Sequence, residues 1–157
     1  MRSLALMVAL LPAVVLAPSN ANAQCVVRGA SFSSYGTSCP TGTANSPLLS
    51  GSFIPTRCQI AMNFKAYAGC CNEYLTGRTL MFGLAPANVP LSPYCTLLVQ
   101  PMVLVTWAPS QGSTLTVNLP RNTSPGSVFV QGIATYYYTL GRRTKYMMTH
   151  GLKVTIW

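Results

Sequence analysis

The chain has 157 residues, of which ten are lysine or arginine, one is glutamate (Glu73), one is histidine (His150) and none is aspartate, giving a formal net charge of +9 at pH 7. This inventory excludes a Ser-His-Asp triad and a pair of catalytic carboxylates, and it is too poor in acids for a carboxylate calcium site. Charged residues make up 7% of the chain, against about a quarter in ordinary domains, so the surface is either covered by partners or coated with uncharged polar side chains.

Residues 1–23 have the features of a secretory signal peptide: a basic start, an apolar run over 4–16 and small residues at Ala21 and Ala23. The apolar run has about 13 residues, whereas a membrane-spanning helix needs roughly 20. We therefore expect cleavage before Gln24, no membrane span, and a protein that is secreted or held at the cell surface. The remaining chain is expected to form one domain, with an extended, disulfide-tied lead-in at 24–46 and a β-sandwich at 47–157.

Six cysteines follow the signal peptide, which predicts a disulfide framework formed in an oxidising compartment. Their spacing includes no Cys-x-x-Cys pair and the sequence has one histidine, so we expect no metal site. Cys70 and Cys71 are neighbours, and they bond either to each other in a strained eight-membered ring or, as we prefer, to separate partners. From the residues alone every pairing stays open among Cys25, Cys39, Cys58, Cys70, Cys71 and Cys95.

Short apolar and alternating segments, separated by turn residues, fill the middle of the chain. The clearest is 58–67, where Ile60, Met62 and Phe64 share one face, as in a half-buried strand. Residues 68–77 and 85–93 are expected to be loops, the second because it contains three prolines. Glu73, in the first loop, is expected to pair with an arginine. Strands are expected at 47–54, 58–67, 79–84 and 113–119, and within 94–107, which Pro101 divides, either as two short strands or as one strand bent at a bulge.

The last third of the chain predicts two long strands, 127–136 and 145–157, which are rich in β-branched and aromatic residues and separated by the turn residues 141–143. We interpret His150 as a strand residue hydrogen-bonded to a neighbour or to solvent. No helix of ordinary length is indicated. About seven or eight short strands with turn signals between them predict an all-β fold, namely an antiparallel β-sandwich of immunoglobulin-like or jelly-roll-like type.

Five fragments, taken in order, resemble a group of small secreted β-sandwich modules of planctomycetes and related bacteria. They are YGTSCP (35–40), PLL (47–49), PLSPYCTLLV (90–99), GSVFVQG (126–132) and THGLKVTI (149–156). Members of that group usually have asparagine where His150 stands here. The resemblance implies the sandwich fold and export but hardly any activity. It also implies a bond between Cys39 and Cys95, which belong to two of these fragments, whereas the other four cysteines lie outside the shared pattern.

A basic and aromatic cluster at the turn between the two terminal strands is the candidate ligand-binding site. Such a cluster binds polyanions by charge, or sugars by stacking. The alternative is a solvated hairpin end whose basic residues discourage edge-to-edge pairing. We expect acidic or neutral polysaccharide as a ligand, and no nucleic acid. The candidate residues are Tyr136, Tyr137, Tyr138, Arg142, Arg143 and Lys145. Asn122-Thr123-Ser124 also matches a glycosylation acceptor, which matters if the source is eukaryotic.

These features favour a secreted, non-catalytic structural protein that self-associates as a homopolymer, into a filament or a coat, without a cofactor. Segments 79–84 and 113–119 carry no charge and are expected to be exposed sheet edges. The lead-in 24–46 is expected to add to such an edge, in its own subunit or in the next one. The alternative function is a lectin-like module that binds glycans at the cell surface.

Overall fold

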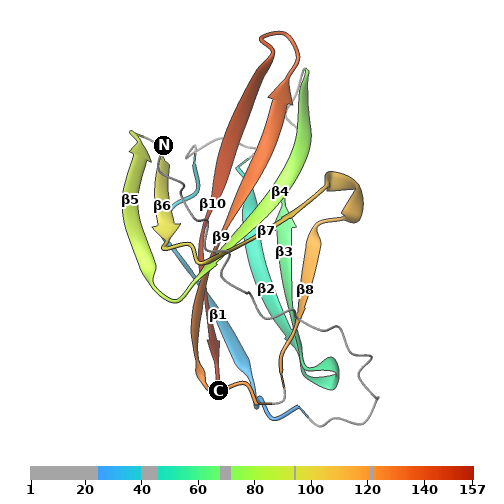
Figure 1. Ribbon diagram of the computed structural model, residues 1–157, viewed down its shortest axis with the longest axis vertical. Coiled ribbons are helices and arrows are strands. Elements are labelled where there is room, and N and C mark those ends of the chain that lie inside the picture. Colours follow the sequence, from blue (N-terminus) through green and yellow to red (C-terminus); the bar gives the residue numbers. More distant parts are fainter. Residues whose placement is uncertain (1–24, 40–45, 68–71, 94, 121) are drawn as a thin grey trace, which may run out of the picture.

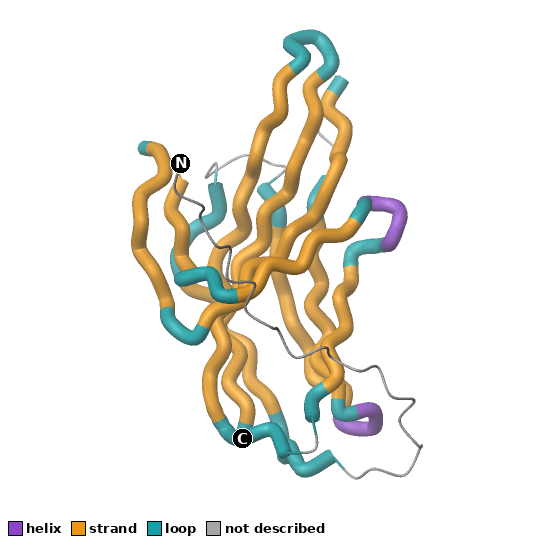
Figure 2. Tube along the Cα trace, in the orientation of Figure 1, coloured by secondary structure: helices purple, strands orange, loops and turns teal. Residues whose placement is uncertain are grey.

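The computed structural model describes residues 25–39, 46–67, 72–93, 95–120 and 122–157. These residues form ten antiparallel β-strands and two short 3-10 helices, with no α-helix among them (Figures 1 and 2). The predicted all-β, disulfide-linked antiparallel fold is therefore confirmed. No helix in the described ranges is long and apolar enough to cross a membrane. The expected signal peptide and the residues Cys70 and Cys71 lie outside the described residues.

The largest sheet has five strands in the order β1-β10-β9-β4-β7. Its long central strands come from the two terminal segments that the sequence predicted, and β4 lies beside them. Neighbouring strands pair antiparallel throughout. The strand order makes β1 and β7 the two edges of this sheet. The strands are β1 (Ala30–Tyr35), β4 (Glu73–Gly83), β7 (Val103–Trp107), β9 (Gly126–Tyr138) and β10 (Arg143–Ile156).

Two smaller sheets flank the large one, as Figure 1 shows, with β5 and β6 on one side of it and β2, β3 and β8 on the other. The three-stranded sheet has the order β2-β3-β8, and the two-stranded sheet is the hairpin β5-β6. Short 3-10 helices occur at η1 (Pro55–Arg57) and η2 (Pro109–Gln111). The strands are β2 (Leu48–Ile54), β3 (Gln59–Lys65), β5 (Pro86–Ser92), β6 (Cys95–Val99) and β8 (Thr114–Asn118).

The main hydrophobic core lies between the large sheet and the three-stranded sheet. The alternation predicted for β3 is confirmed, since Ile60, Met62 and Phe64 are all buried. Phe64 packs edge-on against Trp107, with the ring centroids 6.2 Å apart. A Cβ atom at Gly132 would lie 3.0 Å from the Phe64 ring, so glycine lets β9 approach β3 closely at this point. We call this side of the large sheet the core face.

The opposite side of the large sheet, which we call the amide face, is covered by the hairpin β5-β6 over a much smaller apolar cluster. That cluster contains Cys39, Met81 and Met148, with Leu97 and Ile133 against it. Gln131 on β9 is fully buried beneath the hairpin and holds it by hydrogen bonds. Its side-chain oxygen accepts from the Leu98 N–H at 2.9 Å. The side-chain nitrogen of Gln131 donates to the carbonyl oxygens of Thr96 at 3.2 Å and Thr149 at 3.0 Å.

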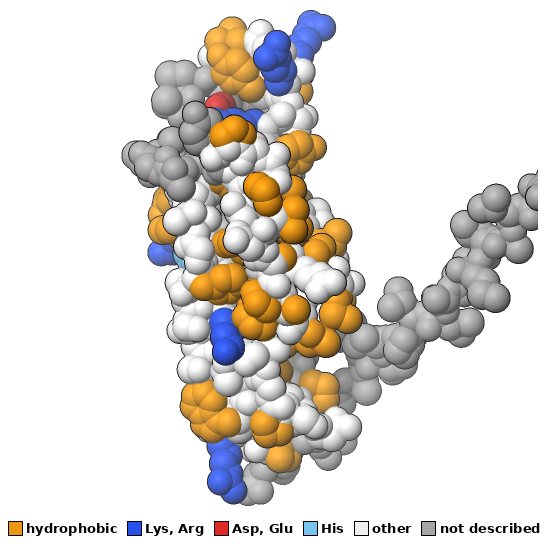
Figure 3. Space-filling view, turned by 90° about the vertical axis from the view of Figure 1, so that its left-hand side faces the viewer, with side chains coloured by type: hydrophobic (Ala, Val, Ile, Leu, Met, Phe, Trp, Pro, Cys, Tyr) orange, Lys and Arg blue, Asp and Glu red, His pale blue; other side chains and the backbone are white. Residues whose placement is uncertain are grey.

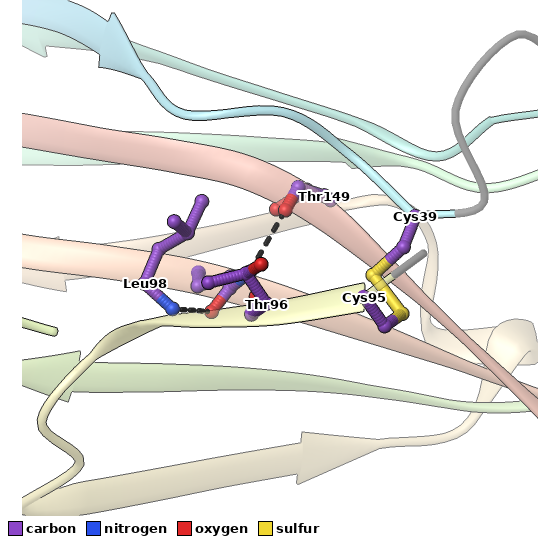
Figure 4. The surroundings of a disulfide bond; sticks show 6 residues. Cys39, Cys95, Thr96, Leu98 and Thr149 are labelled. Atoms are coloured by element: carbon purple, nitrogen blue, oxygen red, sulfur yellow. Dashed lines mark hydrogen bonds between the residues drawn. A yellow bond between two sulfur atoms is a disulfide. The ribbon is translucent and has the colours of Figure 1, made fainter. Parts of the chain in front are cut away.

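Two disulfides tie the chain across these layers. Cys39 is bonded to Cys95, which confirms the pairing that the resemblance implies, and Figure 4 shows this bond beside Thr96 at the start of β6. Cys25 is bonded to Cys58, a pairing that the sequence left open. The first bond fixes the hairpin β5-β6 to the amide face, and the second fixes the chain before β1 to the start of β3.

Three predictions about local structure are wrong. The segment 85–93 is not a loop, because β5 occupies most of it; β5 pairs with β6 alone, so its prolines cost few ladder hydrogen bonds. Glu73 to Gly77 is also not a loop, since β4 begins at Glu73 and pairs with β9 around a bulge at 75–77. The strand that contains 79–84 is consequently internal rather than an edge, with β7 and β9 on its two sides.

The lead-in contains a regular strand that belongs to the large sheet. β1 pairs with β10 of its own chain over six residues, from Ala30 opposite Ile156 to Tyr35 opposite Gly151. The Tyr35 hydroxyl donates to the Leu98 carbonyl at 2.9 Å and so also holds β6. The lead-in was expected to pair with a sheet edge either in its own subunit or in the next one, and the structure has it paired within its own subunit. This strand and β5 raise the number of strands from the expected seven or eight to ten.

Candidate functional site

The end of the hairpin β9-β10, together with the start of β4, is where the structure places the sequence-predicted ligand residues. Figure 1 shows these three strands projecting beyond the other sheets. Tyr138 lies opposite both Glu73 and Arg143, and Tyr137 lies opposite both Tyr74 and Thr144. Because paired residues in an antiparallel ladder share a face, the consecutive residues Tyr137 and Tyr138 point to opposite faces of the sheet.

Tyr136 is not a ligand-binding residue of this surface, because it is only 1% exposed and packs in the main core. β-Strand alternation turns it toward the core face, which the sequence analysis did not take into account. Its buried hydroxyl has no hydrogen-bond partner in the part of the chain that the structure describes. Burial raises the pKa of Tyr136, the charge of Glu73 raises it further, and Arg78 opposes this shift.

Lys145 is less available than the sequence suggested, because its Nζ lies 3.3 Å from a carboxylate oxygen of Glu73. Both residues lie on the core face of the sheet, on either side of β9. The expectation that Glu73 is a loop residue paired with an arginine is therefore wrong on both points. The pair is partly exposed, at 47% for Lys145 and 21% for Glu73, so its contribution to stability is small.

Arg142 and Arg143 are the free basic groups of this end. Both are exposed, and neither side chain forms an ion pair or a hydrogen bond with a described residue. Arg142 has a φ of 47° and lies in the turn, where its N–H donates to the Thr139 carbonyl. The predicted clustering of arginines at the hairpin end is thus present, with Tyr138 rather than Tyr137 on the same face as Arg143.

The sequence analysis missed two tyrosines that lie on the same face as Tyr137. Tyr74 is its direct partner on β4, and Tyr146 lies on β10 opposite Thr135, two residues along the strand from Thr144. The exposed fractions are 59% for Tyr74, 38% for Tyr137 and 64% for Tyr146. Correct placement of β4 over residue 74, followed by alternation along all three strands, would have found them.

The edge strand β7 forms a second exposed surface. Leu104 lies opposite Met81 on the amide face and Val103 lies opposite Phe82 on the core face. Both are exposed, at 63% and 55%, and Met102 just before the strand is 66% exposed. Beside them is an open depression of about 180 Å³ whose lining is apolar: Phe82, Gly83, Leu84, Met102, Val103 and Val128.

The far end of β7 is anchored rather than free. Arg78, which is 8% exposed, donates from its guanidinium to the carbonyl oxygens of Pro109 at 3.2 Å and Gly112 at 3.0 Å. The Trp107 indole N–H donates to the same Gly112 carbonyl at 3.0 Å. These bonds hold η2 against β4. The outer edge of β7 itself has no strand partner among the described residues.

Glu73 and His150 have separate partners in this fold. Glu73 contacts Lys145, whereas His150 lies at a bulge of β10 with its Nε2 2.9 Å from the Leu49 carbonyl oxygen of β2. The interpretation of His150 as a hydrogen-bonded strand residue is confirmed. Among the described residues no group of three or more histidines, cysteines or acids is placed to hold a metal ion. Asn122 is exposed in the turn before β9.

Comparison with protein-family models gives no match, and neither do comparisons with curated proteins and with solved structures. The resemblance to secreted planctomycete modules therefore stays a prediction. Function has to be inferred from the two exposed surfaces, the tyrosines at the hairpin end and the edge strand β7.

Proposed function

We propose that this chain is an exported, non-catalytic structural subunit that self-associates by pairing β7 with β7 of a second copy. The observation that carries the proposal is an edge strand whose outer side has no partner among the described strands and whose two faces carry exposed apolar side chains, Val103 on one and Leu104 on the other. Native sheets usually protect such an edge with charges, prolines or a covering segment. A strand from a second copy would satisfy the free backbone groups and bury these side chains together.

The charge distribution favours a second copy of this chain as the occupant. No charged residue occurs between Arg78 and Arg121, a stretch that includes β5, β6, β7 and β8. Elsewhere basic residues greatly outnumber the single acid, so two copies repel each other across most of their surfaces. Figure 3, which shows the molecule from the side of β5 and β6, displays basic side chains close together at the top and, below them, a mainly hydrophobic and uncharged surface with few basic side chains. Contact through β7 keeps like charges apart.

Among the edges of the described sheets, β7 is better suited to this contact than the others. β8 was one of the two edges expected from the sequence and is an edge of the three-stranded sheet, but its exposed residues are mainly threonine and asparagine. β1 contains four small residues and packs across β2, where the Phe32 ring fills the space beside Gly51. β5 also exposes large apolar residues, Val89 and Leu91, but its two prolines interrupt the edge. β7 combines a free edge without proline with large exposed apolar residues and an adjacent apolar depression.

The geometry of the contact decides the form of the assembly. An antiparallel β7-β7 pair is a twofold contact in which both copies use the same strand, so it closes as a dimer. A filament formed by the lead-in is not favoured, because β1 is already paired with β10 of its own chain. Growth beyond a dimer requires a second contact, and β8 is an uncharged edge of the three-stranded sheet that has one strand partner, β3, in the described part of the chain.

Export and the absence of catalysis are supported by chemistry already described. Two disulfides stabilise the fold, which fits synthesis for an oxidising compartment. The one acid is occupied by Lys145 and the one histidine lies at a carbonyl of β2, so both side chains have structural contacts. These contacts favour a structural subunit over a hydrolase.

The test is sedimentation velocity of the chain from Gln24 to Trp157 at high micromolar concentration and moderate salt. We expect dimers or larger species for the wild type and monomers for the variant Leu104→Lys, because a charge on the edge strand opposes pairing. The matched control is Thr116→Lys, which puts the same charge on the edge strand β8 and should leave the dimer intact. A monomeric wild type, or a Leu104→Lys variant that associates as strongly, would refute the proposal.

A further inference from the structure

We infer that the exposed tyrosines at the hairpin end form a binding surface for a polysaccharide, preferentially an acidic one. We define the tyrosine face as Tyr74, Tyr137 and Tyr146 together with Thr135 and Thr144, all on the amide-face side of β4, β9 and β10. This surface differs from the predicted cluster, of which it keeps only Tyr137 and the neighbouring arginines. It is also independent of β7.

The composition of the tyrosine face matches a carbohydrate. Every one of its five side chains carries a hydroxyl group, and three also offer an aromatic ring. A pyranose sugar presents C–H groups on its faces and hydroxyls around its edge, so it stacks on a ring and exchanges hydrogen bonds with neighbouring hydroxyls. Tyrosine is suited to such contacts because it is apolar along the ring and polar at the tip. None of the three tyrosine hydroxyls has a hydrogen-bond partner among the described residues.

The arrangement of the rings is fixed by the sheet. Tyr74 and Tyr137 are direct partners on adjacent strands, whose side chains lie about 5 Å apart at Cβ. Tyr146 is diagonal to Tyr137, at roughly 7–8 Å between backbones. The next residues toward the centre, Ile133 and Met148, belong to the cluster around the Cys39–Cys95 bond. Three rings on consecutive strands therefore form one continuous, well-anchored surface along which an extended chain of sugars can lie.

The charge around the tyrosine face favours an acidic polymer. Arg142 and Arg143 are exposed at the end of the same hairpin and form no ion pair with a described residue. The only acid in the sequence, Glu73, is held by Lys145 on the opposite face of the sheet. Carboxylates on a polysaccharide that extends past the hairpin end would thus meet the free guanidinium of Arg142 in the turn, whereas Arg143 lies on the core face, in the same row as Glu73, and can be reached only around the end of the hairpin.

A protein partner is the weaker alternative for this surface. Protein contacts are usually centred on apolar anchors that become fully buried. Such anchors are found at β7, as Val103 and Leu104, whereas the tyrosine face has no aliphatic side chain among its five positions. The aliphatic side chains of β7 suit an interface with a second copy, whereas the hydroxyl-bearing side chains of the tyrosine face suit sugars.

The experiment measures binding of the mature protein to an immobilised panel of polygalacturonate, alginate, hyaluronan, dextran and cellulose. We expect binding to at least one uronic-acid polymer, and a loss of about tenfold or more in affinity for the double variant Tyr74→Ser/Tyr146→Ser, which removes two stacking rings. The control variant is Tyr67→Ser, whose tyrosine is 48% exposed but follows β3. It should bind as the wild type does. The variant Arg142→Gln/Arg143→Gln should weaken binding to uronic-acid polymers and lessen its dependence on salt.

A second readout uses no variant. Nitration by tetranitromethane, mapped by mass spectrometry, should label Tyr74, Tyr137 and Tyr146 in the free protein and label them less when the bound polymer is present, while Tyr67 is labelled equally. Binding is also measured with Leu104→Lys, so that a failure of self-association does not affect the result. The inference is overturned if no polymer of the panel binds, or if the tyrosine variant binds undiminished. It is equally overturned if that variant loses self-association instead, because the face would then be a contact between copies.

Discussion

The two faces of the five-stranded sheet are covered in different ways. The core face buries a broad set of apolar residues, among them Leu80 and Val130, against the three-stranded sheet, which contributes Phe64. The amide face has only three buried residues in its cluster and is held instead by a disulfide, by Gln131 and by the Tyr35 hydroxyl. A hairpin that buries little apolar area can thus be fixed by a disulfide and a few hydrogen bonds. The loss of any one of these bonds then removes a larger share of what holds the hairpin to the sheet.

The same difference explains where the exposed surfaces lie. Because β5-β6 is a two-stranded layer, it covers the amide face only in part, and the tyrosines toward the hairpin end remain exposed. On the core face Tyr136, next to Tyr137 in the chain, is buried. The contrast leads to four predictions, in which substitutions on the core face and on the amide face lower the free energy of unfolding by different amounts.

The largest effect is expected on the core face. Phe64→Ala removes a fully buried ring that contacts Trp107 and Gly132, and should lower the free energy of unfolding by about 3–5 kcal/mol. Chemical denaturation measures this loss. The matched variant Phe53→Ala removes a ring that is only partly buried, so it should cost clearly less. Equal losses in the two variants would contradict the assignment of Phe64 to the centre of the core.

The disulfide of the amide face comes next. Replacing Cys39 and Cys95 together with serine should cost about 2–4 kcal/mol, because the bond closes a loop between residues 56 positions apart. Hydrogen exchange should show the loss of protection first in β6, at the Leu98 N–H. The comparison variant Cys25→Ser/Cys58→Ser removes the other bond, which is distant from β6 in the chain. If both variants open β6 equally, the local role of Cys39–Cys95 is wrong.

A smaller effect is expected from the buried amide. Gln131→Met keeps the length of the side chain but leaves the Leu98 N–H and the Thr96 carbonyl without their partner. We expect a loss of about 1–3 kcal/mol in thermal or chemical unfolding. Gln59→Met is the control, because its amide bonds to Asn118 at an exposed site. A Gln131 variant as stable as this control would show that the amide does not hold the hairpin.

The smallest effect concerns Tyr35, whose pKa burial raises from 10.0 to about 12. The neutral phenol is favoured in the folded state, so the stabilisation is complete below pH 10 and is lost as the pH rises toward 12. Tyr35→Phe removes the bond to the Leu98 carbonyl and should cost about 0.5–1.5 kcal/mol at neutral pH. This difference from the wild type should shrink between pH 10 and 12. A difference that stays constant over that range would contradict the role of the hydroxyl.

The sequence predicted the parts of the fold in which local pattern and tertiary pairing agree. Alternation in β3 identified its buried face, and Pro101 separated β6 from β7. β1 was missed as a strand because its serines give a weak pattern and its pairing with β10 comes from the opposite end of the chain. β5 was missed because proline usually marks a loop, and the pattern does not show that this strand pairs on one side only.

The candidate site was predicted in location but not in composition. The arginines and Tyr137 are exposed at the hairpin end as expected, while Tyr136 is buried. Tyr74 could not be included because it comes from a strand that the sequence analysis treated as a loop. Which tyrosines share a face depends on the register of three strands, and a bulge at 75–77 shifts that register.

The pairing of β1 with β10 also has a consequence for the order of folding. β1 is the first strand of the described chain and β10 the last, so β1 lacks its partner until the chain has been made as far as residues 143–156. Contacts between such distant segments form slowly, because a long loop must close before they are gained. The sheet is completed only after the final strand arrives.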